Sequence, residues 1–149
     1  MQFSRYIAIL LSLPLVLTSV PSCSGKPDAL SKVSSSLLQQ VEIRRQQIAS
    51  PNDQRLKQMQ DMGMNPGNLK VQQVFIYLKE PLTATQEKQL TEMGVKIYPD
   101  SWIPPVGNNP TGFLTAEMPV DMLEALAQID FIIRLDTSER KSSPNMSGQ

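Results

Sequence analysis

The side chains that perform catalysis or bind metal ions are scarce in this sequence. It has 149 residues, a single cysteine at position 23 and no histidine. Without histidine, neither a Ser-His-Asp nor a Cys-His catalytic arrangement can be assembled. A zinc site built from Cys and His has no ligand set either. The sequence therefore predicts a protein that is not an enzyme and that uses no metal or cofactor.

Two other groups of residues have types that occur in active sites. The carboxylates Glu117, Asp121 and Glu124 are close in sequence. We expect them at a strand edge and in the solvated first turns of a helix, where carboxylates favour the helix dipole. Gly107 and Gly112 bracket an Asn-Asn-Pro run, which is turn chemistry and not a phosphate-binding loop. Function is therefore expected to reside in a binding surface.

Cys23 follows the most apolar run of the chain. Arg5 is followed by the apolar residues 6–20 and then by small residues, which is the order of a secretory signal. As a helix, residues 6–20 would rise about 22 Å, which is less than the roughly 30 Å hydrocarbon layer. A spanning anchor is therefore not expected.

The sequence Val-Pro-Ser-Cys at 20–23 resembles a bacterial lipobox, in which the cysteine is lipidated and becomes the first residue of the mature chain. The resemblance implies a signal peptide at 1–22, export, and a membrane anchor in the cell envelope through a lipid on Cys23. It also explains an unpaired thiol in an exported protein. Cleavage by a general signal peptidase, giving a secreted or periplasmic protein, is one alternative, and an uncleaved N-terminus is another.

The charge balance limits the expected partners. The whole chain has a formal net charge of 0, and removal of residues 1–22 takes away only the charge of Arg5. No basic field is present to attract nucleic acid or anionic lipid. We therefore expect a protein partner and no nucleic acid.

Composition divides the mature chain into a tether at 23–29, a helical extension at 30–68, a domain at 69–137 and a polar tail at 138–149. In the extension, apolar residues recur with helical spacing over 30–48 and again at 56–62, before Gly63. We interpret the extension as a spacer partly packed on the domain, with a partner-binding helix as the alternative. The serine-rich tail is expected to be flexible.

Residues 69–137 alternate between strand and helix patterns. Strands are predicted over 71–79, 95–98, 112–118 and 131–136. One helix is predicted over 84–93, where Thr83 and Gln86 have the spacing of a capping box, and another begins at Pro119. The order β-α-β-β-α-β predicts an α+β fold, the ferredoxin-like sandwich, in which a four-stranded antiparallel sheet carries two helices on one face.

The runs LTATQEKQLTEMGVKIY (82–98) and GFLTAEMPVDMLEALAQIDFIIRLD (112–136) resemble the propeptide and inhibitor domains of subtilisin-like serine proteases. The shared features are a helix ending in Leu-x-x-x-Gly-Val, a strand ending in Ala-Glu-x-Pro, and a helix that leads to a final apolar strand. KVSSSLLQQ (32–40) resembles the short helix that precedes such domains. No protease domain follows within this sequence.

Strand alternation assigns the side chains of the predicted sheet to two faces. Facing the helices we expect Val74, Ile76, Leu78, Leu114, Ala116 and Leu135. The opposite face then presents Phe75, Tyr77, Tyr98, Phe113, Ile132 and Arg134. A clustered exposed apolar patch marks an interaction site, so we predict that these residues bind a partner. The alternative is that the helical extension folds over them.

The resemblance implies how such a surface is used. In the protease propeptides the open sheet packs on the protease, and the C-terminal tail, here from Asp136 onward, lies along the active-site cleft. The leading hypothesis is therefore a binding module that inhibits an extracytoplasmic subtilisin-like protease or assists its folding. The second hypothesis is an interaction or scaffold lipoprotein of the cell envelope that is unrelated to proteases.

Overall fold

The computed structural model describes residues 29–140 of the chain. The predicted signal peptide, Cys23, most of the tether and residues 141–149 lie outside the described residues. Within 29–140, no helix is both long enough and apolar enough to cross a membrane.

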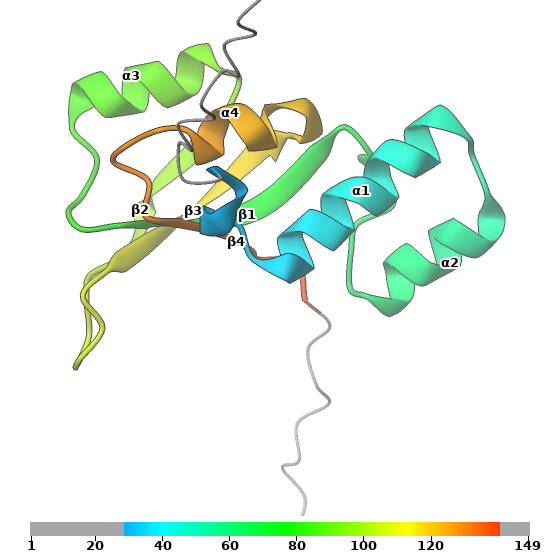
Figure 1. Cartoon of the computed structure of the whole chain (residues 1–149), viewed down its shortest axis with the longest axis horizontal. Coiled ribbons are helices and arrows are strands. Elements are labelled where there is room, and N and C mark those ends of the chain that lie inside the picture. The colour runs from blue at the N-terminus through cyan, green and yellow to red at the C-terminus, as the bar shows by residue number, and fades with distance from the viewer. Residues whose placement is uncertain (1–28, 141–149) are drawn as a thin grey trace, which may run out of the picture.

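Four antiparallel strands form one sheet (Figure 1). They are β1 (Val71–Leu78), β2 (Lys96–Ile103), β3 (Gly112–Pro119) and β4 (Arg134–Thr137), and their order across the sheet is β2-β3-β1-β4. The prediction of an α+β fold with a four-stranded antiparallel sheet is confirmed.

Two helical connections lie on one face of this sheet (Figure 1). Helix α3 (Ala84–Glu92) joins β1 to β2, and its start has the predicted capping box: the Thr83 hydroxyl accepts from the N–H of Gln86, and the Gln86 side chain accepts from the N–H of Thr83. A 3-10 turn, η2 (Val120–Met122), and helix α4 (Leu123–Ala127) join β3 to β4. The turn that follows α3 contains Gly94, whose φ of 80° is one that glycine adopts without strain.

The helical extension is part of the same packed unit. It consists of a 3-10 turn, η1 (Ala29–Lys32), followed by α1 (Ser35–Ala49) and α2 (Asp53–Asp61). Leu37 and Val41 of α1 are buried in the core that the sheet shares with α3 and α4. Helix α2 packs on α1 through a small second cluster made of Ile43, Met59 and Met64.

An ion pair and a hydrogen bond to the backbone hold α1 beside α4. Arg45 donates to both carboxylate oxygens of Glu124, at 2.8 Å each, and to the backbone oxygen of Val120 at 2.8 Å. The hydrogen bond from Arg45 lowers the pKa of Glu124, against the smaller opposing effect of burial. Helix α1 therefore lies on the face of the sheet that α3 and α4 cover, and not on the opposite face.

The main core lies between the sheet and these helices. The six residues predicted to face the helices are all buried, among them Val74, Ile76 and Leu135, which have no exposed surface. Leu126 of α4 is also completely buried. Burial of a side chain of this size contributes about 1.5–3 kcal/mol to stability.

Several element boundaries differ from the predictions. The predicted single helix from residue 30 is divided into η1 and α1, because Val33 pairs with Leu135 in a parallel bridge and Ser34 then caps α1. Strand β2 continues to Ile103, beyond the predicted end at residue 98, through an irregular register between Tyr98 and Ile103. Strand β4 begins at Arg134 and not at residue 131.

The late start of β4 corrects the prediction for Ile132. This residue was expected on the face opposite the helices, but its side chain is completely buried in the core. The N–H of Ile132 bonds to the backbone oxygen of Ile129, so Ile132 belongs to the turn that follows α4. Strand alternation therefore does not apply to it.

Residues 138–140 were predicted to belong to the polar tail. The packed structure does not end at Thr137, since Glu139 is 7% exposed and bonds to α1 and to the start of β1. Residues 138–140 are therefore part of the fold, and a cleft-binding tail cannot begin at Asp136 without unfolding this segment.

Candidate protein-binding face

One face of the sheet carries aromatic side chains that no described helix covers. Strand alternation places Phe75 and Tyr77 of β1, Phe113 of β3 and Tyr98 of β2 on this face, where each is half-buried. We call this surface the open face; it comprises the outward side chains of the four strands. The prediction of which sheet face the four aromatic residues occupy is confirmed. The extension covers the other face.

The aromatic rings contact one another across β1 and β3. Phe75 and Phe113 meet edge to face with their centroids 5.0 Å apart, and Tyr77 and Phe113 lie 5.4 Å apart at a tilted angle. Pairing also places Ile103 of β2 opposite Phe113, and the Ile103 side chain is 45% exposed. The result is a continuous apolar row, Ile103, Phe113 and Tyr77, in which neighbouring rings hold one another in place.

Charged groups border this apolar row on the β2 side. The Tyr98 hydroxyl donates to Glu117 Oε1 at 2.6 Å, and Lys96 lies 3.9 Å from Glu117 Oε2 and 4.9 Å from the centre of the Tyr98 ring. Lys96 and Glu117 neutralise each other. Two of the three carboxylates that are close in sequence do not gather, because Glu117 accepts from Tyr98 while Glu124 is bound by Arg45. No metal-binding cluster is found among residues 29–140.

Arg134 borders the open face on the β4 side. It pairs with Tyr77 in the register of the sheet, and its guanidinium lies 5.5 Å from the centre of the Tyr77 ring, within the range of a cation–π contact. It also donates to Asp136 Oδ2 at 3.0 Å, as does Arg140. The sequence predicted Arg134 but neither Asp136 nor Arg140 as part of this surface.

The carboxylate of Asp136 is ionised despite being 4% exposed. Burial by itself raises its pKa. Hydrogen bonds from the Ser34 hydroxyl and from the N–H of Thr137, together with the charges of Arg140 and Arg134, outweigh that effect, so the pKa is lowered from the ordinary value of 3.8. Asp136 thus holds both arginines at the edge of the open face.

A buried polar cluster fixes the opposite side of β1. Arg44 is completely buried, and all of its guanidinium nitrogens donate hydrogen bonds. Nε donates to Gln72 Oε1 at 2.9 Å, and Nη1 donates to the backbone oxygens of Asn65 and Asn68 at 3.0 and 2.8 Å. Nη2 donates to both oxygens of Glu139, at 2.8 and 2.6 Å.

Two further residues complete what we call the Arg44 cluster: Arg44, Glu139, Gln72, Gln40 and Thr137. Gln40 donates to the backbone oxygen of Glu139 at 2.9 Å and accepts from Gln72 at 3.0 Å and from the Thr137 hydroxyl. The cluster joins α1, β1 and the residues that follow β4. The cluster was not predicted from the sequence, although one signal is present: Gln72 occupies an inward position in the series Gln72, Val74, Ile76.

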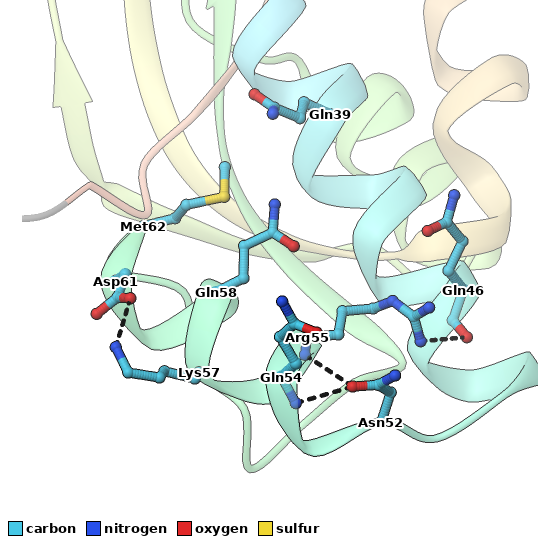
Figure 2. A pocket seen from close by; sticks show the side chains of 9 residues that line it. All are labelled: Gln39, Gln46, Asn52, Gln54, Arg55, Lys57, Gln58, Asp61 and Met62. Carbon is cyan, nitrogen blue, oxygen red and sulfur yellow. Dashed lines mark hydrogen bonds and ion pairs between the residues drawn. The ribbon is translucent and has the colours of Figure 1, made fainter.

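A wide surface groove lies elsewhere, between α1 and α2 (Figure 2). It has a volume of about 920 Å³ and is lined mainly by amide side chains. Its charged groups are used within the protein: Arg55 donates to the backbone oxygens of Ser50 and Gln46, and Lys57 pairs with Asp61 at 3.0 Å. The groove offers neither a nucleophile paired with a base nor an apolar anchor of any size beyond Met62. We therefore place the candidate site on the open face.

Comparisons with known proteins give no relative for this chain. No protein-family model, no curated protein and no solved structure matches it.

Proposed function

We propose that this protein is a non-enzymatic binding module, exported and anchored to the membrane through a lipid on Cys23, that docks on a protein partner through its open face. The observation that carries the proposal is the continuous apolar row of Ile103, Phe113 and Tyr77, which is partly exposed and is held by ring contacts of 5.0 and 5.4 Å. Aromatic residues in a preformed cluster are typical anchors of protein interfaces.

The fold gives this proposal its second support. In the ferredoxin-like sandwich the chain order is β-α-β-β-α-β, and β3 inserts between β1 and β2. The order β2-β3-β1-β4, with α3 and α4 as the two crossovers, fits that arrangement. Such a fold covers one face of its sheet and leaves the other for a partner. We assign the domain to this fold.

We propose a subtilisin-like protease outside the cytoplasm as the partner, with inhibition or assisted folding as the outcome. The support is the resemblance of residues 82–98 and 112–136 to protease propeptides. Because residues 136–140 are held by Ser34 and by the Arg44 cluster, an inhibitory tail must consist of residues 141–149. That segment contains one large apolar residue, Met146, to fill a protease subsite.

The same observation favours a second candidate, a scaffold module of the cell envelope that docks without inhibiting. A fixed segment at 136–140 and a tail with a single apolar side chain suit docking better than occupation of a cleft. The two candidates share the open face and differ in the role of residues 141–149.

The test is titration of residues 24–149 and of residues 24–140 into a panel of subtilisin-like proteases. The shorter form retains Glu139, so its fold is preserved. Inhibition by the longer form that is lost in the shorter one supports the inhibitor. Equal binding by both forms to protease with a blocked active site, without inhibition, supports docking alone.

Two substitutions locate the contact in that experiment. Tyr77→Ala and Phe113→Ala are expected to weaken binding at least tenfold, as truncation of an interface anchor does. Gln128→Ala, at the exposed end of α4, is the control and should leave affinity unchanged. Rapid digestion of both forms, with no binding to any blocked protease, would refute the proposed partner.

A further inference from the structure

Two arginines lie together at the β4 edge of the open face. Arg134 lies in β4 opposite Tyr77, and Arg140 follows the strand. Both donate through Nη2 to the same oxygen, Asp136 Oδ2, each at 3.0 Å. Their side chains are 54% and 63% exposed, respectively. We call Arg134 and Arg140 the arginine pair.

One carboxylate cannot neutralise both members of this pair. Asp136 Oδ1 already accepts from the Ser34 hydroxyl at 2.6 Å and from the N–H of Thr137 at 2.8 Å. The neighbouring Glu139 points into the core, and Glu117 lies on β3 with Tyr98. Among residues 29–140, one positive charge therefore stays uncompensated at this edge, on guanidinium groups that each have five N–H donors.

The surface beside the arginine pair is shaped to admit a ligand group. A hollow of about 450 Å³ is lined by the pair, by Ser35 and Ser36 at the start of α1, and by Met62. Asp136 and Glu139 also line it, but both carboxylates already accept hydrogen bonds from arginines of this chain. On its other side the pair adjoins the apolar row through the contact of Arg134 with Tyr77. The segment 101–116, which supplies Ile103 and Phe113, contains no charged residue.

We infer that the arginine pair binds a carboxylate, an Asp or Glu side chain, on the protein that covers the open face. This inference rests on the proposed function, because it takes the open face as the docking surface. Charge complementarity determines the partner's chemistry: an apolar contact surface with an acidic side chain at one end. Arginine suits this role because its planar fork binds a carboxylate through two parallel hydrogen bonds.

The experiment uses a displayed library of three-helix scaffolds with one randomised face, selected against residues 24–149, which include the whole packed unit. Binders to the open face are defined as those that lose affinity for Phe113→Ala. Among these, we expect enrichment of Asp or Glu, and a loss of at least tenfold for Arg134→Gln combined with Arg140→Gln. Lys88→Gln, on α3 and away from the open face, is the control and should change affinity less than threefold. Thermal unfolding of each variant verifies that the fold is kept.

The possible outcomes distinguish a failure of this inference from a failure of the proposed docking function. Open-face binders without acidic enrichment, or with equal responses to the Arg134/Arg140 double variant and to Lys88→Gln, would overturn the carboxylate site alone. A selection in which no binder responds to Phe113→Ala would overturn both the open face as a docking surface and the inference. Acidic binders that depend on the arginine pair and lose affinity as salt rises would support it.

Discussion

Removal of the Glu139 charge should destabilise the protein strongly, although Glu139 lies among the polar residues near the C-terminus. Each oxygen of this carboxylate is surrounded by donors. Oε2 accepts from Arg44 at 2.6 Å and from the N–H of Asn65 at 3.2 Å, and Oε1 accepts from Arg44 at 2.8 Å and from the N–H of Gln73 at 3.3 Å.

In Glu139→Gln, an amide NH₂ replaces one of the two carboxylate oxygens. Whichever way the amide is turned, this NH₂ faces the two N–H donors that the replaced oxygen had bound. The substitution also leaves the guanidinium of Arg44, which has no exposed surface, without its counter-charge. Breaking a buried ion pair by removal of one partner costs about 3–5 kcal/mol. With a urea slope of about 1.5–2 kcal/mol per molar, the midpoint of unfolding should fall by about 2 M.

The matched control is Glu124→Gln. Glu124 also binds an arginine through both oxygens, but its side chain is 47% exposed, so the expected loss is about 1 kcal/mol or less. Combining Glu139→Gln with Arg44→Met removes both charges, and the pair should cost less than the sum of the single changes. Equal small losses for Glu139→Gln and Glu124→Gln would refute the reasoning that the buried pair holds residues 138–140 in the fold.

Three further predictions concern the core, acid stability and the anchor. Leu126→Ala should cost about 2–5 kcal/mol because it leaves a cavity at a completely buried position, whereas Gln128→Ala should cost almost nothing; chemical unfolding measures both. Because the pKa of Asp136 is lowered, its charge stabilises the fold above the ordinary value of 3.8, and this contribution is lost as the pH falls through the folded-state pKa. Asp136→Asn should therefore flatten the dependence of unfolding free energy on pH in the acid range, and an unchanged slope would contradict the assignment. Cys23→Ser should abolish incorporation of labelled fatty acid; a wild-type chain that incorporates none would contradict lipidation.

Local patterns predicted those parts of the fold that depend on nearby residues. Alternation in β1 and β3 assigned Phe75, Tyr77 and Phe113 to one face because successive side chains of a strand point to opposite sides. The capping box at Thr83 was predictable for a similar reason, since its two hydrogen bonds join residues three apart in sequence.

Contacts between distant residues account for what the sequence did not reveal. Ile132 lies in an apolar run typical of a strand, yet a turn bond to Ile129 decides its position. Ile103 pairs with Phe113 only after an irregularity in β2 that no local pattern indicates. Glu139 has the polar surroundings of a tail, and it is buried because Arg44, 95 positions earlier, needs a counter-charge.

The Arg44 cluster also explains why the aromatic face is left open. The side of α1 that packs on the domain mixes the apolar residues Leu37 and Val41 with Gln40 and Arg44. Buried amide and guanidinium groups must find hydrogen-bond partners. On the covered face, Gln72 and the residues after β4 supply them. These hydrogen bonds hold α1 on the covered face, and no described helix covers the apolar row.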